Sequence, residues 1–268
     1  MGKQTFGGDD DTEYTDEDQP KKLKLSKFEL GPDYNIRDRF WKILGSYAAT
    51  KTPGIDLKKV ESQRIGFVKV AVSVIESRKS AFYGLSPQFV ARYTLMMVLD
   101  GNWEDAFIEF IKDAKESRGE AWKSVVQALK HLLATEKYRN RITEYFKTVI
   151  RRSDAYPYVL FYLPKIKDEG LMKELKREIS IFARGDTDEN QMNAIEALAL
   201  LSDEEDVKNV LLNLMNHWDV NIRSKVADVI KGMQMDEKMT KFLKSKIETE
   251  PDEKIKQILK RKVSKWKK

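Results

Sequence analysis

Residues 218–230 read WDVNIRSKVADVI, and this stretch carries the clearest structural pattern in the chain. Asp219 stands near a turn, where an Asp side chain can accept hydrogen bonds from the first backbone N–H groups of a helix. A run of small and aliphatic residues follows, with Arg223 placed within it and Val229 on its inward side. The pattern predicts a helix over about 220–232 that starts at Asp219 and buries one face.

The same helical pattern recurs before and after this stretch. We predict first helices of successive pairs near 120–134, 154–167, 188–201, 220–232 and 252–266, with second helices near 137–151, 170–184, 203–216 and 236–249. Equivalent inward positions are Leu129, Leu163, Leu198 and Val229, at spacings of 34, 35 and 31 residues. Asp188, Asp219 and Asp252 recur at first-helix starts, and Ser202 with Glu205 can form a capping box before a second helix. One such pair cannot bury its apolar face alone, so the pairs are expected to stack.

The stretch 218–230 resembles the first helix of a HEAT repeat, with an Asp near the turn and an Arg within a small and aliphatic helix. Asp186–Leu201 fits less well because it lacks the Arg. The resemblance covers about residues 119–268 and is weaker over 33–118. It implies an all-α fold, a right-handed HEAT-like solenoid (an α-α superhelix). Such repeats specify an architecture and not an activity.

Residues 33–118 also have helical spacing, with less regular lengths. We predict a helix from Asp33, a long one from Asp56 to about Arg78, one starting at Ser86-Pro87 and running through Leu99, and one over Trp103–Lys115 after the break at 100–102. The β-branched run 67–75 lies inside a helical pattern, and no pair of strands with a hairpin turn is found. These helices are either irregular first repeats or a separate cap. A single continuous body is favoured because no Gly/Ser/Pro-rich linker interrupts it.

The N-terminal residues 1–32 form a third segment with a different composition. Residues 1–20 contain one Lys and seven acidic residues, whereas residues 21–268 contain 48 basic and 36 acidic residues. With almost nothing apolar to bury, the acidic stretch is predicted to be a disordered tail. Three roles are open for this stretch: a solubilising tail, a decoy that competes with anionic ligands for the basic body, or a docking segment for a basic partner. The lysines of residues 21–27 form a short basic arm or a tether.

The amino-acid composition argues against a membrane-spanning or disulfide-bonded protein. The 268 residues are 41% hydrophobic and 34% charged, contain no Cys, and have a mean hydropathy of −0.56. No apolar run of about 18 residues is present to span a membrane. Without Cys there are no disulfides or thiolate metal sites. With no signal peptide either, we expect a cytoplasmic protein.

Motifs for catalysis are missing from the sequence. The chain has two histidines, His131 and His217, and neither has a second His or Cys at ligand spacing. No nucleophile elbow, P-loop, dinucleotide fingerprint or HExxH is found. The four acidic residues at 203–206 are typical of the start of a helix, where the helix dipole favours negative charge, and do not indicate a metal or acid/base site. We therefore expect no catalytic residue, no metal and no cofactor, and no small-molecule substrate.

One enzyme class needs a separate comparison. HEAT-like folds include alkylpurine DNA glycosylases, which this chain resembles in size and positive charge. That family has a Trp-x-x-x-Asp arrangement, but here Gly45, Phe107, Val126 and Ile222 stand four residues after the first four Trp residues, and the chain ends too soon after Trp266. Asp228 also falls where the family has an aromatic residue. A glycosylase is thus the third and least favoured hypothesis.

Basic residues concentrate on two predicted helices. Neutralised phosphates would make binding to nucleic acid salt-dependent with little sequence preference. The sequence does not distinguish DNA from RNA as the ligand. The alternative function is a protein scaffold that does not contact nucleic acid. The basic residues of the last helix have an alternative role as a lysine-rich polar cap of the solenoid. Protein partners would need anchors such as Met192, Met215 or Met239, although their spacing favours the core. The candidate nucleic-acid-binding residues are Lys137, Arg139, Arg141, Lys147, Arg151, Arg152, Arg223, Lys225, Lys260, Arg261, Lys262, Lys265, Lys267 and Lys268.

Overall fold

The computed structural model describes residues 34–52, 54–77, 85–185 and 188–266, and within these ranges the chain is all-α, without a strand. The predictions for residues 1–32, Lys267 and Lys268 lie outside the described residues. The α-helices are α1 (Tyr34–Lys51), α2 (Arg64–Ser77), α4 (Pro87–Asp100), α5 (Glu104–Glu116), α6 (Ala121–Leu133), α7 (Glu136–Val149), α8 (Tyr156–Ile166), α9 (Glu169–Gly185), α10 (Asp188–Leu198), α11 (Glu205–Leu214), α12 (Val220–Gly232), α13 (Glu237–Thr249) and α14 (Glu253–Trp266).

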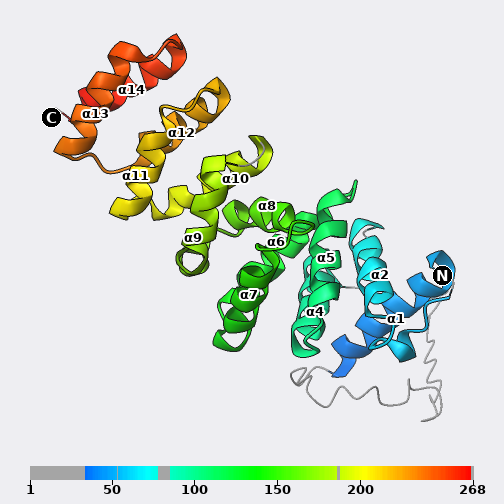
Figure 1. The fold of residues 1–268 in the computed structure, drawn as a ribbon. Helices are drawn as coiled ribbons and strands as arrows, with labels where there is room; N and C mark the ends of the chain where they lie inside the picture. The colour runs from blue at the N-terminus through cyan, green and yellow to red at the C-terminus, as the bar shows by residue number, and fades with distance from the viewer. Residues whose placement is uncertain (1–33, 53, 78–84, 186–187, 267–268) are drawn as a thin grey trace, which may run out of the picture.

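The helices are arranged in a row, with α1 and α14 at opposite ends (Figure 1). From α6 onward the even-numbered helices are the predicted first helices, and each packs against the next one along the row. The second helices α7, α9 and α11 also pack in order. In the N-terminal part α2 packs against α4 and α5, and α4 packs against α6, so the stack continues without a break across the boundary predicted at residues 118 and 119.

Side-chain hydrogen bonds mark where several helices begin. Ser86 accepts from the backbone N–H of Phe89 ahead of α4, with Pro87 as the first helical residue. Asp219 accepts from Asn221 at 2.7 Å, and Asp252 accepts from Ile255 at 2.9 Å. The predicted starts at Ser86, Asp219 and Asp252 are therefore confirmed.

Two predictions about helix starts are wrong. Asp56 caps only a 3₁₀ turn, Leu57–Lys59, and α2 begins later at Arg64. The side chain of Gln63 accepts the N–H of Asp56 at 2.8 Å, which closes this turn and keeps it separate from α2. The capping box of Ser202 and Glu205 also does not form, because Ser202 ends a 3₁₀ turn and the Glu205 carboxylate binds Lys238 at 2.9 Å.

The core runs along the whole row as one cluster from Phe40 to Val263. Of the four predicted inward positions, Leu129, Leu163 and Leu198 are fully buried, whereas Val229 is only half-buried beside the buried Ile230. Met215 and Met239 are also fully buried, and Met192 packs against the core, so these methionines fill it and do not form exposed anchors.

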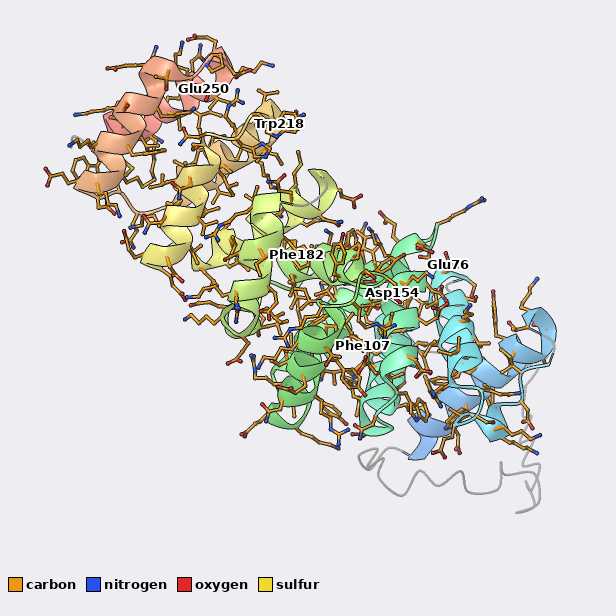
Figure 2. All side chains as sticks on the ribbon, in the orientation of Figure 1. Glu76, Phe107, Asp154, Phe182, Trp218 and Glu250 are labelled. Carbon is orange, nitrogen blue, oxygen red and sulfur yellow. The ribbon has the colours of Figure 1, made fainter. Side chains whose placement is uncertain are left out.

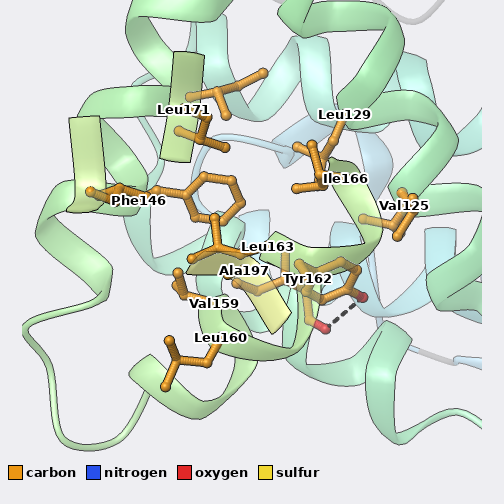
Figure 3. Packing of buried hydrophobic residues seen from close by; sticks show 14 of the residues in the cluster. Val125, Leu129, Phe146, Val159, Leu160, Tyr162, Leu163, Ile166, Leu171 and Ala197 are labelled. Carbon is orange, nitrogen blue, oxygen red and sulfur yellow. Dashed lines mark hydrogen bonds between the residues drawn. The ribbon is translucent and has the colours of Figure 1, made fainter. Parts of the chain in front are cut away.

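Tyr162 joins the N-terminal helices to the later pairs. Its ring is fully buried, and its hydroxyl donates to the carbonyl of Ile111 at 3.0 Å, from α8 across to α5 (Figure 3). Burial raises the pKa of this phenol, so the hydroxyl stays a neutral donor. No helix among the described residues is both long enough and apolar enough to cross a membrane.

Candidate nucleic-acid interface

The cations of α7 are engaged by groups from neighbouring segments of the stack. Arg139 forms a two-pronged pair with Asp168, at 2.9 and 2.7 Å, and Arg141 donates to the carbonyl of Leu99 and, at 2.9 Å, to Asn102 Oδ1. The remaining pairs of this group are Lys137–Asp100 at 3.2 Å, Lys147–Glu174 at 2.9 Å, Arg151–Glu178 at 2.6 Å and Arg152–Asp154 at 3.0 Å. These cations point outward, as the apolar residues on the other face of the helix predict, but carboxylates neutralise most of their charge.

The pairing continues from one second helix to the next. Lys176 on α9 binds Glu204 and Asp206 at 2.7 Å each, next to and within α11. Lys208 on α11 binds Asp236 before α13, also at 2.7 Å. A partner of each of Arg139, Lys147, Arg151, Lys176 and Lys208 lies 27 to 29 residues further along the chain, and Asp206, the second partner of Lys176, lies 30 residues further. A pair at this spacing links each second helix to its successor and sets the register between them.

The Arg139–Asp168 pair leads to a prediction about acid. Hydrogen bonds from Arg139 lower the pKa of Asp168, so this carboxylate stabilises the fold above its unfolded pKa of about 3.9 and loses that effect as the pH falls through its folded pKa. Asp168→Asn can still accept the N–H of Leu171 and removes only the charge. We expect it to lower the free energy of unfolding by about 1 kcal/mol or less at neutral pH, and by less near about pH 3.

The measurement is denaturant unfolding of the wild type and the Asp168→Asn variant at the two pH values. A difference in stability that is the same at both would contradict the ion pair as its source.

Arg223 is not available to a ligand. Its side chain is 8% exposed and binds Glu250, which is fully buried, with the closest contact at 3.0 Å. Its Nη1 also donates to the carbonyls of His217 and Trp218, at 2.9 Å each. Lys225, the other candidate on α12, pairs with Glu196 at 2.7 Å. Both residues therefore hold segments of the stack together.

The cations of α14 are in a different situation. Lys260, Arg261 and Lys265 are exposed, and none of them has a carboxylate partner among the described residues. Within α14 the first residue, Glu253, is the only acid against six basic residues. The excess positive charge predicted from the composition is thus unneutralised at the C-terminal end of the row.

A hollow of about 270 Å³ lies between α14 and the end of α12, lined by Lys231, Ile258, Arg261, Lys262 and Lys265. Lys262 donates to the carbonyls of Lys231 and Met233, which end α12. Burial and the charge of Lys265 lower the pKa of Lys262. An anion bound in this hollow would relieve the repulsion between these like charges.

Two exposed tryptophans were not identified as surface residues by the sequence. Trp218 is 84% exposed at the turn before α12, toward the C-terminal end of the row (Figure 2). The helical spacing of Ile255, Leu259, Val263 and Trp266 predicts that Trp266 is buried with the other three, but it is 44% exposed. It lies three residues after Val263, the last buried residue of α14.

Comparisons with known proteins give no family. No protein-family model matches the chain, and no curated protein matches it. A crystal structure described as an engineered protein matches with a TM-score of 0.45 and 13% identity, over 85% of this chain and 95% of that one. This similarity is too low to support a conclusion about fold or function. Within the described residues no group of three His, Asp or Glu side chains is placed to hold a metal ion.

Proposed function

We propose that the chain is a non-catalytic, right-handed HEAT-like solenoid that binds nucleic acid through the phosphate backbone. The observation that carries this proposal is the charge of Lys260, Arg261 and Lys265 on α14, which are exposed and have no carboxylate partner among the described residues. Cations without protein partners are free to replace the counterions of a phosphate backbone, whereas paired cations must first give up a carboxylate. The described residues also hold no candidate metal centre, and the absence of cysteine suits a cytoplasmic protein.

The stacked architecture supports the assignment of HEAT-like repeats. Asp219 caps α12, and Arg223 holds the turn in front of that helix, so both features of the 218–230 pattern have a structural role. The arrangement also places α14 at the end of the row of described helices (Figure 1). Because Lys260, Arg261 and Lys265 are exposed, a duplex or a single strand could reach them without displacing another described element.

The test is a pair of charge reversals on the last two helices. Arg261→Glu with Lys265→Glu should weaken binding to labelled DNA and RNA about tenfold or more, because two phosphate contacts become repulsive. Lys241→Glu with Lys244→Glu is the matched control. It changes the net charge equally at two exposed lysines of α13 that have no carboxylate partner among the described residues.

Fluorescence anisotropy with single-stranded and duplex probes measures both variants. We expect the control to lose about threefold or less. Equal losses in the two variants would mean that only the overall charge attracts the probe, and no binding by the wild type would end the proposal.

A protein partner is the second candidate function, supported by a different surface. Trp218 is 84% exposed and Val220, two residues later, is 40% exposed. Trp is the residue most enriched at the energetic centres of protein interfaces. A scaffold that uses this turn would bind its partner with little dependence on salt, and Trp218→Ala would abolish that binding while leaving the affinity for nucleic acid unchanged.

A further inference from the structure

A second hollow, remote in sequence from α14, lies between α4 and α6. It has a volume of about 250 Å³ and is lined by Ser86, Gln88, Phe89, Arg92, Gln127, Ala128 and His131. Arg92 and His131 meet in it, with Arg92 Nη1 3.1 Å from His131 Nε2. Its lining contains no carboxylate, and within the described residues neither Arg92 nor His131 has an acidic partner.

Arg92 is held in place by aromatic rings. The rings of Phe89 and Tyr93 stack with centroids 4.1 Å apart. The guanidinium carbon of Arg92 lies 5.6 and 5.5 Å from these two centroids. Cation–π contacts of this kind fix the position of a guanidinium without using its N–H groups. The side chain is therefore oriented before any ligand arrives.

Among the residues that the structure describes, most donors of Arg92 have no acceptor. A guanidinium carries five N–H groups, and His131 is the one hydrogen-bond acceptor that the described residues give Arg92. Because a guanidinium can only donate, His131 Nε2 is the acceptor in this contact. Gln88 and Gln127 add primary amides from α4 and α6 to the same lining. The hollow thus presents several donors and one fixed positive charge.

The geometry points to an oxyanion site in this hollow, for inorganic phosphate or a phosphate monoester held by the guanidinium of Arg92 and the amides of Gln88 and Gln127, next to His131. A planar guanidinium matches two oxygens of a phosphate at once. A tetrahedral oxyanion has further oxygens for amide donors on the other helix, which a planar carboxylate lacks. The site is separate from the α14 cations and does not depend on nucleic-acid binding.

The experiment uses the two histidines of the full chain, which give two imidazole Hε1 signals in an NMR spectrum. Inorganic phosphate is titrated at constant ionic strength and pH. We expect the His131 signal to move and saturate, while the His217 signal, whose Nδ1 accepts from Asp219 N–H, stays in place. Acetate at the same concentrations should produce no saturable shift.

Two variants make the result specific. Arg92→Lys keeps the positive charge and loses the planar fork, so the apparent affinity for phosphate should fall by about tenfold. Lys130→Ala removes the charge next to His131 from a residue that does not line the hollow, and it should keep the wild-type affinity.

Either of two outcomes would overturn the site: shifts of His131 and His217 that grow together without saturating, or saturation that is equal for acetate and phosphate. Arg261→Glu with Lys265→Glu should leave the His131 titration unchanged, whatever it does to nucleic-acid binding.

Discussion

Arg223→Ala is expected to lower the free energy of unfolding by about 3–5 kcal/mol, because it leaves the carboxylate of Glu250 buried without its main partner. Burial raises the pKa of Glu250, but the hydrogen bonds from Arg223 and the N–H of Asp252 lower it more, so this carboxylate is ionised in the intact fold. The variant also removes the donor of the His217 and Trp218 carbonyls. The turn at 217–218, helix α12 and the end of α13 therefore lose the side chain that links them.

The matched control is Lys225→Ala, two residues further along the same helix. Its ion pair with Glu196 is partly exposed, so its removal should cost about 1 kcal/mol or less. A double variant, Arg223→Met with Glu250→Leu, should recover part of the loss because no charge is then left buried. Denaturant unfolding of the four proteins measures these differences. A loss for Arg223→Ala no larger than that for Lys225→Ala would contradict the buried pair.

Phe107→Ala is also expected to lower the free energy of unfolding by about 3–5 kcal/mol. Phe107 is fully buried on α5, and its ring centroid lies 5.2 Å from that of Tyr145 and 5.7 Å from that of Phe146, both on α7. The cavity would open between the N-terminal helices and the later pairs. Hydrogen exchange should therefore show reduced protection in α2 and in α7 together.

Ile181→Ala is the control for this cavity. Ile181 is 58% exposed on α9, so shortening it should change the stability by about 0.5 kcal/mol or less. Reduced protection confined to α2, α4 and α5 would show that residues 33–118 unfold as a separate domain.

Helix positions were predictable because their determinants are local. A capping Asp or Ser and the spacing of apolar residues both lie within one helix, and the structure places α12 over Val220–Gly232, as the sequence predicts. The helix start predicted at Asp56 was wrong because the turn there is closed by a hydrogen bond from Asp56 N–H to Gln63, seven residues away. The outward direction of the α7 cations was also predictable from the apolar stripe on the other face of that helix.

The ion-pair partners were not predictable from single helices. Whether Lys147 meets Glu174 depends on how α7 and α9 are aligned, which the sequence of neither helix determines. A signal was nevertheless present, since an acid follows several of these cations after 27 to 29 residues, close to the length of one helical pair. Reading charges at the period of the repeat would have predicted these pairs between successive second helices.

The most direct test of the central claim is the salt dependence of nucleic-acid binding, compared between the wild type and the Arg261→Glu, Lys265→Glu variant. Binding constants are measured from about 50 to 200 mM salt, where each phosphate contact contributes about 0.7 to 0.9 to the logarithmic slope. The account predicts a slope that becomes shallower by about 1 for each α14 cation lost, and no change in slope for the Lys241→Glu, Lys244→Glu control. A slope unaffected by the α14 reversals, with binding still present, would contradict it.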